Sequence, residues 1–299
     1  MKTAISVLIA LIAVQATQFR TGVEAVRVDV LVMDGAKPIT DLQADDFELR
    51  DNGVVQTIES VAISDVPVSM MVALDTSESV AGHVLQELKE GVSAAAAALR
   101  PVDRAALISF SSDVRLTMDW AGDSPAVPNA LSQLRAGGGT ALWDATFAAL
   151  TFSDETPAVR RLVLVFSDGD DTSSWLSRES VLEKARRTDV VVYAVEIRDA
   201  YSRRVSGLHN RSGIGSFKNV LPDDSPFLEE VADLTGGSRF RINDAAELRR
   251  AFAKVLVEFR TRYLITYTAQ GVDQAGWHPL EVRLKAKKGK VTARRGYVR

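Results

Sequence analysis

Short apolar runs separated by helix-like segments are the feature that most constrains how this chain can fold. The clearest runs occupy residues 69–74, 162–166 and 190–197. Continuous apolar runs of this length are typical of parallel strands that are buried on both faces of a sheet. Because helical patterns alternate with the runs, we expect an α/β domain over residues 67–259, built on a doubly wound, mostly parallel sheet with helices on both faces.

The two ends of the chain follow a different pattern, in which apolar and polar residues alternate between turn signals. This pattern covers residues 24–63 and returns in the last forty residues. Alternation is typical of half-buried strands, and two or three isolated strands are only marginally stable. We therefore expect the segments 17–66 and 260–299 to pack together as one small β domain, into which the α/β domain is inserted.

The first sixteen residues have the pattern of a secretory signal peptide. Lys2 precedes an apolar run over residues 4–14, and Val14-Gln15-Ala16 supplies the small residues that signal peptidase requires. A helix of about eleven residues rises about 16 Å, roughly half the hydrocarbon thickness of a bilayer. A buried first strand and an uncleaved anchor are the alternatives. We expect residues 1–16 to direct export to the periplasm or the extracellular space, and the mature chain to have no membrane span.

The composition excludes several kinds of chemistry. The chain has 299 residues and no cysteine, which excludes disulfides, zinc–thiolate sites, iron–sulfur clusters and cysteine nucleophiles. A formal net charge of −3 gives no general attraction to nucleic acid. Residues 283–299 are basic, but their alternation favours the solvated face of a β-hairpin over a polyanion-binding patch. We expect no nucleic-acid partner, and any metal site to be built from oxygen.

Oxygen-bearing side chains gather at the ends of two of the apolar runs. The first run is followed by Asp-Thr-Ser-Glu-Ser and the second by Ser-Asp-Gly, while a Gly-Gly-Gly-Thr loop lies between them in the sequence. In an open parallel sheet, ligands bind outside the carboxyl ends of the strands, where the strand order reverses. Two carboxylates and three hydroxyls suit a hard divalent cation such as Mg²⁺. The five residues are Asp75, Ser77, Ser79, Thr140 and Asp168.

This joint pattern resembles the von Willebrand factor type A (VWA) domain with its metal-ion-dependent adhesion site. A D-x-S-x-S sequence, a Thr after a glycine run and an Asp in a strand-ending S-D-G occur in the family's order, and the likeness covers roughly residues 67–259. The flanking segments also resemble a bacterial secreted subfamily, through short patterns such as Val28-Asp29-Val30 and Arg295-Gly296-Tyr297.

The resemblance implies a six-stranded Rossmann-like sheet and a bound divalent cation, with Mg²⁺ expected and Mn²⁺ or Ca²⁺ as alternatives. It implies that Ser77 and Ser79 bind the ion directly. Asp75 or Asp168 would bind it through water, and Thr140 directly or through water. An open coordination position would then accept an Asp or Glu side chain of a partner protein.

Other polar residues lie near the expected site. Asp144 follows Thr140 by four residues, and we expect it either to support the ligands from behind or to stabilise the start of the helix. We expect Asp170 and Asp171 to cap a helix rather than to hold a second ion. The polar segment 200–224 is long for a connection. This segment either shapes the choice of partner or is a surface loop without a binding role.

The sequence contains no G-x-S-x-G elbow, no phosphate-binding loop with Lys and no H-E-x-x-H. Its three histidines, His83, His209 and His278, lie in segments that pair none of them with a nucleophile. We expect no catalysis. The expected function is that of a secreted or periplasmic protein-binding module, for adhesion or assembly, whose cation captures a partner carboxylate. A structural envelope scaffold stabilised by the cation and a metal-dependent hydrolase are the alternatives.

Overall fold

The computed structural model describes residues 25–63, 66–122, 126–157, 160–197, 226–242, 245–273 and 275–299. The expected signal peptide at residues 1–16 and the polar segment 200–224 lie outside these residues, so both stay predictions. No helix in the described ranges is long and apolar enough to cross a membrane.

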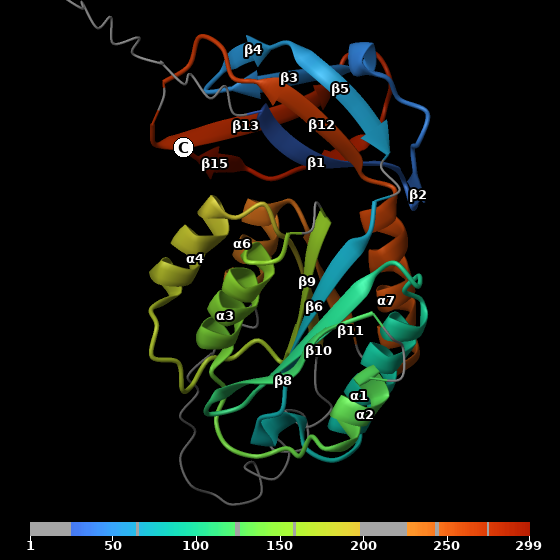
Figure 1. Ribbon diagram of the computed structural model, residues 1–299, viewed down its shortest axis with the longest axis vertical. Helices are drawn as coiled ribbons and strands as arrows, with labels where there is room; N and C mark the ends of the chain where they lie inside the picture. Colours follow the sequence, from blue (N-terminus) through green and yellow to red (C-terminus); the bar gives the residue numbers. More distant parts are fainter. Residues whose placement is uncertain are drawn as a thin grey trace, which may run out of the picture.

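A six-stranded sheet lies at the centre of the larger part of the molecule (Figure 1). Its strands, in order across the sheet, are β11 (Ser238–Ile242), β10 (Val191–Ile197), β9 (Arg160–Ser167), β6 (Val68–Asp75), β7 (Arg104–Phe110) and β8 (Val114–Ala121). Neighbouring strands are parallel except for β7 with β8. All residues of β6 are buried, because both faces of the sheet are covered.

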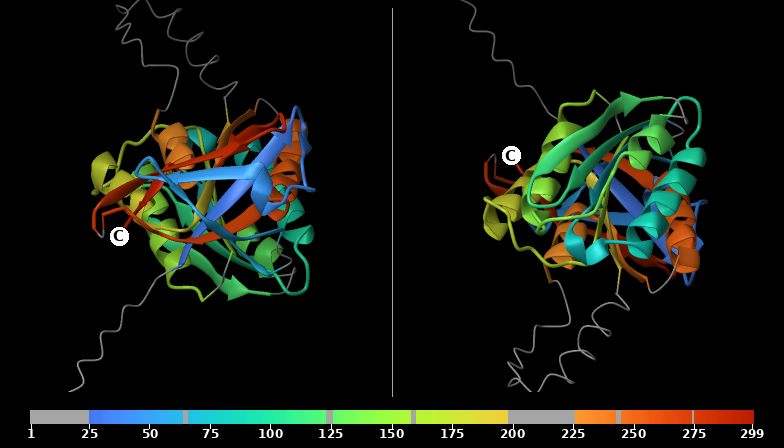
Figure 2. Two further views of the ribbon diagram at one scale, coloured as in Figure 1. Left: turned by 90° about the horizontal axis from the view of Figure 1, so that it is seen from above. Right: turned by 90° about the horizontal axis from the view of Figure 1, so that it is seen from below.

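Helices form a layer on each face of this sheet (Figure 2). One layer contains α1 (His83–Ala97), α2 (Ala126–Ser132) and α7 (Ala245–Arg260), and the other contains α3 (Leu142–Asp154), α4 (Arg178–Arg187) and α6 (Pro226–Thr235). Successive residues of β6 enter two different hydrophobic cores: Met70 packs in the core under α1 and α7, and Met71 in the core under α3. The expected α/β class is therefore confirmed. The short helix α2 was not predicted, because its seven residues are too few to show a helical period.

The flanking segments form two antiparallel sheets, which we call the β domain; the part from β6 to α7 is the α/β domain. One sheet contains β14 (Lys290–Thr292), β1 (Ala25–Asp34), β12 (Tyr263–Thr268) and β5 (Ile58–Ile63), with β2 (Lys37–Pro38) beside β1. The other contains β15 (Gly296–Val298), β13 (Trp277–Leu284), β3 (Phe47–Asp51) and β4 (Val54–Gln56). β1 pairs with β12 and β3 pairs with β13, so both flanks contribute strands to each sheet and share one hydrophobic core.

A buried polar cluster joins the two sheets of the β domain. The Asp51 carboxylate accepts hydrogen bonds from the hydroxyls of Tyr267 and Tyr297, each at 2.8 Å, and lies 2.9 Å from Nδ1 of His278. Asp51 and His278 are both fully buried. Because a buried carboxylate is stable only when it is well hydrogen-bonded, the cluster holds β3, β12, β13 and β15 in one arrangement.

Two buried arginines bridge the β domain and the α/β domain. Arg160, the first residue of β9, donates to the Asp29 carboxylate of β1 at 3.0 Å. Arg262, which follows α7, donates to the Tyr193 hydroxyl of β10 at 3.1 Å and to the backbone carbonyl of Asp29 at 3.3 Å. The junction is therefore made by buried charged hydrogen bonds that span the two domains.

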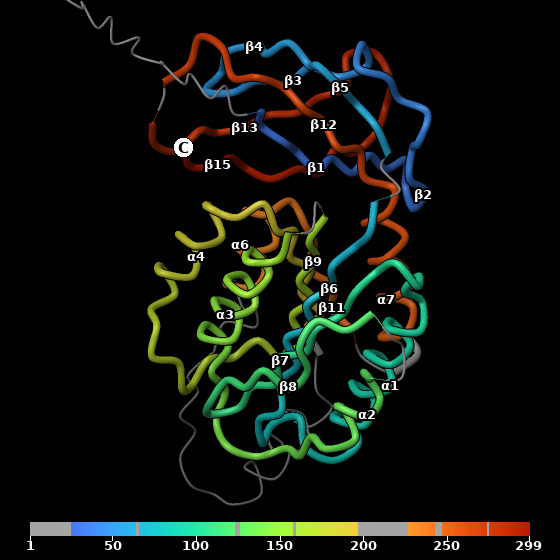
Figure 3. Tube along the Cα trace, in the orientation of Figure 1, coloured from blue at the N-terminus to red at the C-terminus, as the bar shows by residue number. Residues whose placement is uncertain are grey.

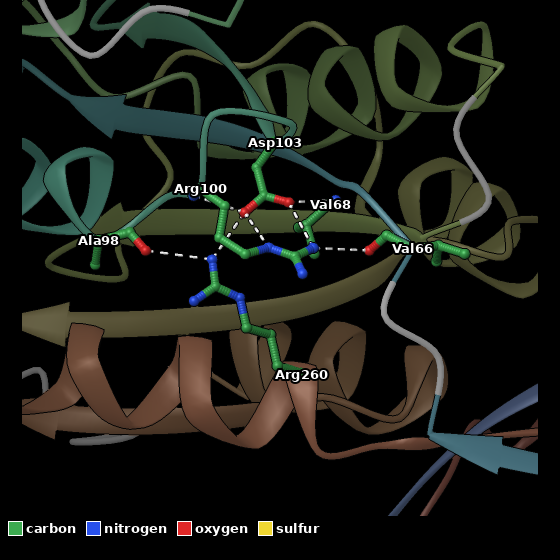
Figure 4. Close-up of polar contacts among 6 residues, drawn as sticks. All are labelled: Val66, Val68, Ala98, Arg100, Asp103 and Arg260. Atoms are coloured by element: carbon green, nitrogen blue, oxygen red, sulfur yellow. Dashed lines mark hydrogen bonds and ion pairs between the residues drawn. The ribbon is translucent and has the colours of Figure 1, made fainter.

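The chain crosses between the domains ahead of β6 and again after α7, and Figure 3 shows these crossings on the same side of the molecule. Asp103 ties them together (Figure 4). Its buried carboxylate accepts hydrogen bonds from the Val68 N–H at 2.9 Å and from the Arg260 guanidinium at 2.8 Å. Arg100 also binds this carboxylate and donates to the Val66 carbonyl at 3.1 Å. One carboxylate thus fixes the start of β6 and the end of α7.

Candidate metal-binding site

The predicted ligand residues lie at the end of the α/β domain that is remote from the β domain. β6 begins at the junction and runs away from it (Figure 1). Asp75 is the last residue of β6, and Asp168 directly follows its parallel neighbour β9. The chain builds β7 on one side of β6 and later β9 on the other, so the strand order reverses between β6 and β9. Such a reversal is where open α/β sheets bind ligands.

The Asp75 carboxylate is fully buried and bound by short hydrogen bonds. It accepts one from the Ser77 N–H at 2.8 Å and one from the Ser167 hydroxyl at 2.7 Å. Burial, followed by the negative charge of Asp168, raises the pKa of Asp75 to about 6. The structure therefore places the two predicted carboxylates close enough to repel each other.

Asp168 has an unsatisfied oxygen. Its Oδ1 is buried and accepts no hydrogen bond from any described residue. Burial raises the pKa of Asp168 most, the Ser79 hydroxyl lowers it by hydrogen bonding, and the charge of Asp170 raises it further. A buried carboxylate beside a half-buried one, both with raised pKa values and with one buried oxygen that lacks a donor, is costly unless a cation lies between them. The residues present therefore fit a divalent cation.

Three hydroxyls complete the predicted set. The Ser77 and Ser79 hydroxyl oxygens are 2.9 Å apart; Ser77 is buried and Ser79 is half-buried. Thr140 is buried just before α3, and its loop is bound to the loop that carries the serines. The Gly138 carbonyl accepts a hydrogen bond from the Glu78 N–H at 3.0 Å. The structure thus brings both carboxylates and all three hydroxyls to one end of the sheet.

The loop between β9 and α4 holds Thr140 in place. The Thr140 N–H donates to the Thr172 hydroxyl at 2.8 Å, and the Thr140 carbonyl accepts from the N–H groups of Thr172 and Ser173. A Cβ at Gly139 would lie only 2.1 Å from the Ser173 hydroxyl oxygen, which explains a glycine directly before Thr140. This clamp sets the position of the third hydroxyl.

Asp144 supports that loop, and none of its described hydrogen bonds goes to the five predicted ligands. Its carboxylate accepts from the N–H groups of Trp175 and Leu176, each at 2.9 Å. Asp171 accepts from the Trp143 N–H at 3.1 Å and so caps the start of α3, which confirms the expected capping role. The other expected cap, Asp170, is exposed.

Sequence reasoning missed three residues that shape the site. Ser167 binds Asp75, Thr172 binds Thr140, and the Ser112 hydroxyl accepts from the Gly139 N–H at 2.7 Å. Ser167 lies next to Asp168 in the sequence, so its position in the motif could have revealed it. Thr172 and Ser112 lie in loops whose positions no local pattern predicts.

The oxygen donors determine what the site can do. Among the described residues, no group of three or more His, Cys, Asp or Glu side chains could hold a metal ion. The candidate site has two carboxylates, and its remaining donors are neutral hydroxyls. Hydroxyl and carboxylate oxygens suit Mg²⁺, Mn²⁺ or Ca²⁺.

Comparison with known proteins gives the family. The model of the von Willebrand factor type A domain matches residues 69–231, which is more than half of the chain. The chain belongs to this family. An uncharacterized protein of Borreliella burgdorferi is 27% identical to this VWA protein over 151 residues, which cover 48% of the chain and 43% of the relative. The match thus spans less than half of that relative's length.

Two solved structures have a similar fold. A von Willebrand factor type A protein from Catenulispora acidiphila aligns with a TM-score of 0.53 and 14% identity, covering 90% of this chain and 75% of the other. A mutant of the PilB minor pilin from Streptococcus sanguinis aligns with a TM-score of 0.50 and 11% identity, covering 66% and 62%. At such low sequence identities, the two comparisons show a similar fold and nothing more specific.

Proposed function

We propose that this VWA domain binds a divalent cation, Mg²⁺ in the first instance, and uses it to capture a carboxylate of a protein partner. The proposed ligands are Asp75, Ser77, Ser79, Thr140 and Asp168. The observation that supports this most is the buried Asp168 Oδ1, which has no hydrogen-bond donor among the described residues and lies beside a second buried carboxylate.

The neutral hydroxyls explain why a partner carboxylate suits this site. They bring no formal charge, so the cation keeps the capacity to attract a further anion. When bound, the cation would supply electrostatic attraction for an Asp or Glu side chain of the partner. The chain's own residues would hold the cation, and their positions are fixed by their neighbours: Ser167 binds Asp75, and Thr172 binds Thr140.

Titration calorimetry of the full chain with Mg²⁺, Mn²⁺ and Ca²⁺ tests the first step. We expect saturable binding to the wild type, and at least tenfold weaker binding to the Asp75→Asn and Asp168→Asn variants. Asp170→Asn removes an exposed acid next to the site and is the matched control. Unchanged affinity in both ligand variants would refute the proposed ligand set.

The alternatives give different results. A scaffold stabilised by a cation would show a Mg²⁺-dependent rise in melting temperature while binding no acidic peptide or protein. A hydrolase would turn over phosphate or carboxylate esters in the presence of Mg²⁺ or Mn²⁺. We propose that catalysis is absent: His83 lies at the start of α1, and His278 is buried in the β domain beside Asp51.

Export to the periplasm or the extracellular space belongs to the same proposal, and it rests on the charged and apolar pattern of residues 1–16. Fusion of these residues to a reporter that is active only outside the cytoplasm tests it. We expect activity with residues 1–16 and none when a charged residue interrupts the apolar run.

A further inference from the structure

The loop between β9 and α4 presents a tryptophan to solvent. The Trp175 side chain is 94% exposed, while the next most exposed large apolar side chain in the described residues, Val102, is 57% exposed. A side chain so exposed adds almost nothing to the hydrophobic stabilisation of the fold. Exposed tryptophans are costly in solubility and are enriched where proteins bind partners. Packing within the part of the chain that the structure describes therefore does not account for Trp175.

The backbone on both sides of Trp175 is held in place. Asp144 accepts hydrogen bonds from the N–H groups of Trp175 and Leu176, each at 2.9 Å. One residue earlier, the Ser174 hydroxyl donates to Asp171, which also caps α3. A partner that binds the indole would not have to order this loop, so little conformational entropy would be lost on binding.

The same loop contacts the proposed cation site. Thr172 binds the N–H of the proposed ligand Thr140 at 2.8 Å, and the Ser173 N–H donates to the Thr140 carbonyl at 3.0 Å. Three residues of extended chain span at most about 11 Å, so the backbone of Trp175 lies no further than this from that of Thr172. The indole and the cation site therefore lie within reach of one short peptide segment.

We propose that Trp175 is a second recognition point for the partner. The partner presents an extended segment in which an Asp or Glu binds the cation and an apolar side chain, two to four residues away, packs on the Trp175 indole. An extended chain advances about 3.3 Å per residue, so two to four residues cover roughly 7–13 Å. This inference rests on the proposed function, because the acidic residue needs the cation.

The chemistry around the site limits the partner's second side chain. Glu78 and Asp170 are both exposed beside the proposed ligands, so a second acid on the partner would be repelled. The free energy of binding gained when an apolar side chain covers the indole is larger than that gained when a solvated Lys or Arg side chain lies over the face of the ring.

Selection of a displayed library of random twelve-residue peptides on the full chain tests this inference. Binding takes place in Mg²⁺ and elution in EDTA, so that only cation-dependent peptides are recovered. We expect enriched peptides to pair an Asp or Glu with an apolar residue at a spacing of two to four. A synthetic peptide of this pattern should bind Trp175→Ala roughly tenfold more weakly than the wild type, while Trp175→Phe keeps most of the affinity.

Two controls separate binding from folding. Val102→Ala alters an exposed apolar residue in the turn between α1 and β7, at the other end of the α/β domain, and should leave peptide affinity unchanged. The melting temperature of Trp175→Ala should equal that of the wild type, because the side chain is exposed. Peptide addition should also shift the tryptophan emission of the wild type to the blue, and this shift should be absent in Trp175→Phe.

The other outcomes of the peptide selection and the affinity measurements each contradict a defined part of this inference. Equal peptide affinity of Trp175→Ala and wild type, with elution by EDTA retained, overturns the role of Trp175 and leaves the proposed function intact. Enrichment of Lys or Arg at the second position overturns the apolar assignment. If no peptide is eluted by EDTA, the proposed function fails and this inference fails with it.

Discussion

At the scale of single residues, the two proposed acidic ligands, Asp75 and Asp168, illustrate how a candidate binding site can oppose folding. Burial, followed by the negative charge of Asp168, raises the pKa of Asp75, and the Oδ1 of Asp168 has no hydrogen-bond donor among the described residues. At neutral pH without a cation, these carboxylates repel each other. Functional sites commonly carry a local stability cost of this kind.

Asp168→Asn should therefore have opposite effects with and without Mg²⁺. In EDTA at neutral pH, removal of the charge should stabilise the variant by about 1 kcal/mol relative to the wild type. In Mg²⁺ the wild type should gain stability, by about 2.7 kcal/mol at a hundredfold excess of Mg²⁺ over its Kd, whereas the variant should gain none. Thermal unfolding in both buffers measures this, with Asp34→Asn, which removes an exposed acid at the end of β1, as control. A variant that is less stable than the wild type in EDTA would contradict the argument.

At the scale of secondary-structure elements, Asp103 connects the turn after α1, the start of β6 and the end of α7 (Figure 4). Burial raises the pKa of Asp103, but hydrogen bonds from Arg100 and from the backbone outweigh this, and the pKa falls to about 2. A carboxyl group with a lowered pKa stabilises the fold fully above its unfolded value near 3.9. This stabilisation is lost as the pH falls toward 2.

The acid sensitivity of the fold should therefore depend on Asp103. The lowered pKa corresponds to about 2 kcal/mol of stability between pH 5 and pH 2. Urea unfolding at pH 5 and at pH 2.5 should show this loss in the wild type, and a smaller loss in Asp103→Asn, which is already weakened at pH 5. Asp113→Asn, at an exposed ion pair with Arg115, should unfold as the wild type does at both pH values. Equal pH dependence in Asp103→Asn would show that another carboxylate is responsible.

The sequence predicted the strands of the α/β domain, and the convergence of the proposed ligand residues at one end of its sheet, better than it predicted the loops. β6 and β9 were predictable because buried parallel strands leave continuous apolar runs. The convergence of the proposed ligand residues was predictable because their spacing places oxygen atoms at strand ends. The loop between β9 and α4 carries no periodic pattern. Its position depends on hydrogen bonds to Asp144 and Thr140, which are remote in sequence, so neither the clamp by Thr172 nor the display of Trp175 could be predicted.

At the scale of the whole molecule, the β domain and the α/β domain are joined by buried groups. Arg262 donates to the Tyr193 hydroxyl of one domain and to the Asp29 carbonyl of the other, and both Arg160 and Arg262 are almost completely buried. The two flanks of the α/β domain must also be brought together before the β domain can form, because each of its sheets uses strands from both flanks. We therefore expect the two domains to unfold together.

Arg262→Met should weaken this coupling. Loss of the buried hydrogen bonds leaves carbonyl oxygens unsatisfied and should destabilise the protein by about 3 kcal/mol. In scanning calorimetry the wild type should show one transition, and the variant a broadened or split one. Arg115→Met, at an exposed ion pair, should leave the single transition in place. Two resolved transitions in the wild type would show that the domains are already independent.

Coupled unfolding also means that a ligand at one end of the molecule should protect the other end. The proposed cation site lies at the end of the α/β domain remote from the β domain (Figure 1), so a cation bound there would contact no residue of β1 or β12. If the domains unfold as one unit, Mg²⁺ should nevertheless slow hydrogen exchange of the most protected amides in both strands, by the same free energy as in β6. In Arg262→Met the slowing should persist in β6 and disappear in β1 and β12. Protection confined to the α/β domain of the wild type would mean that the buried arginines join the domains in space without making them one cooperative unit.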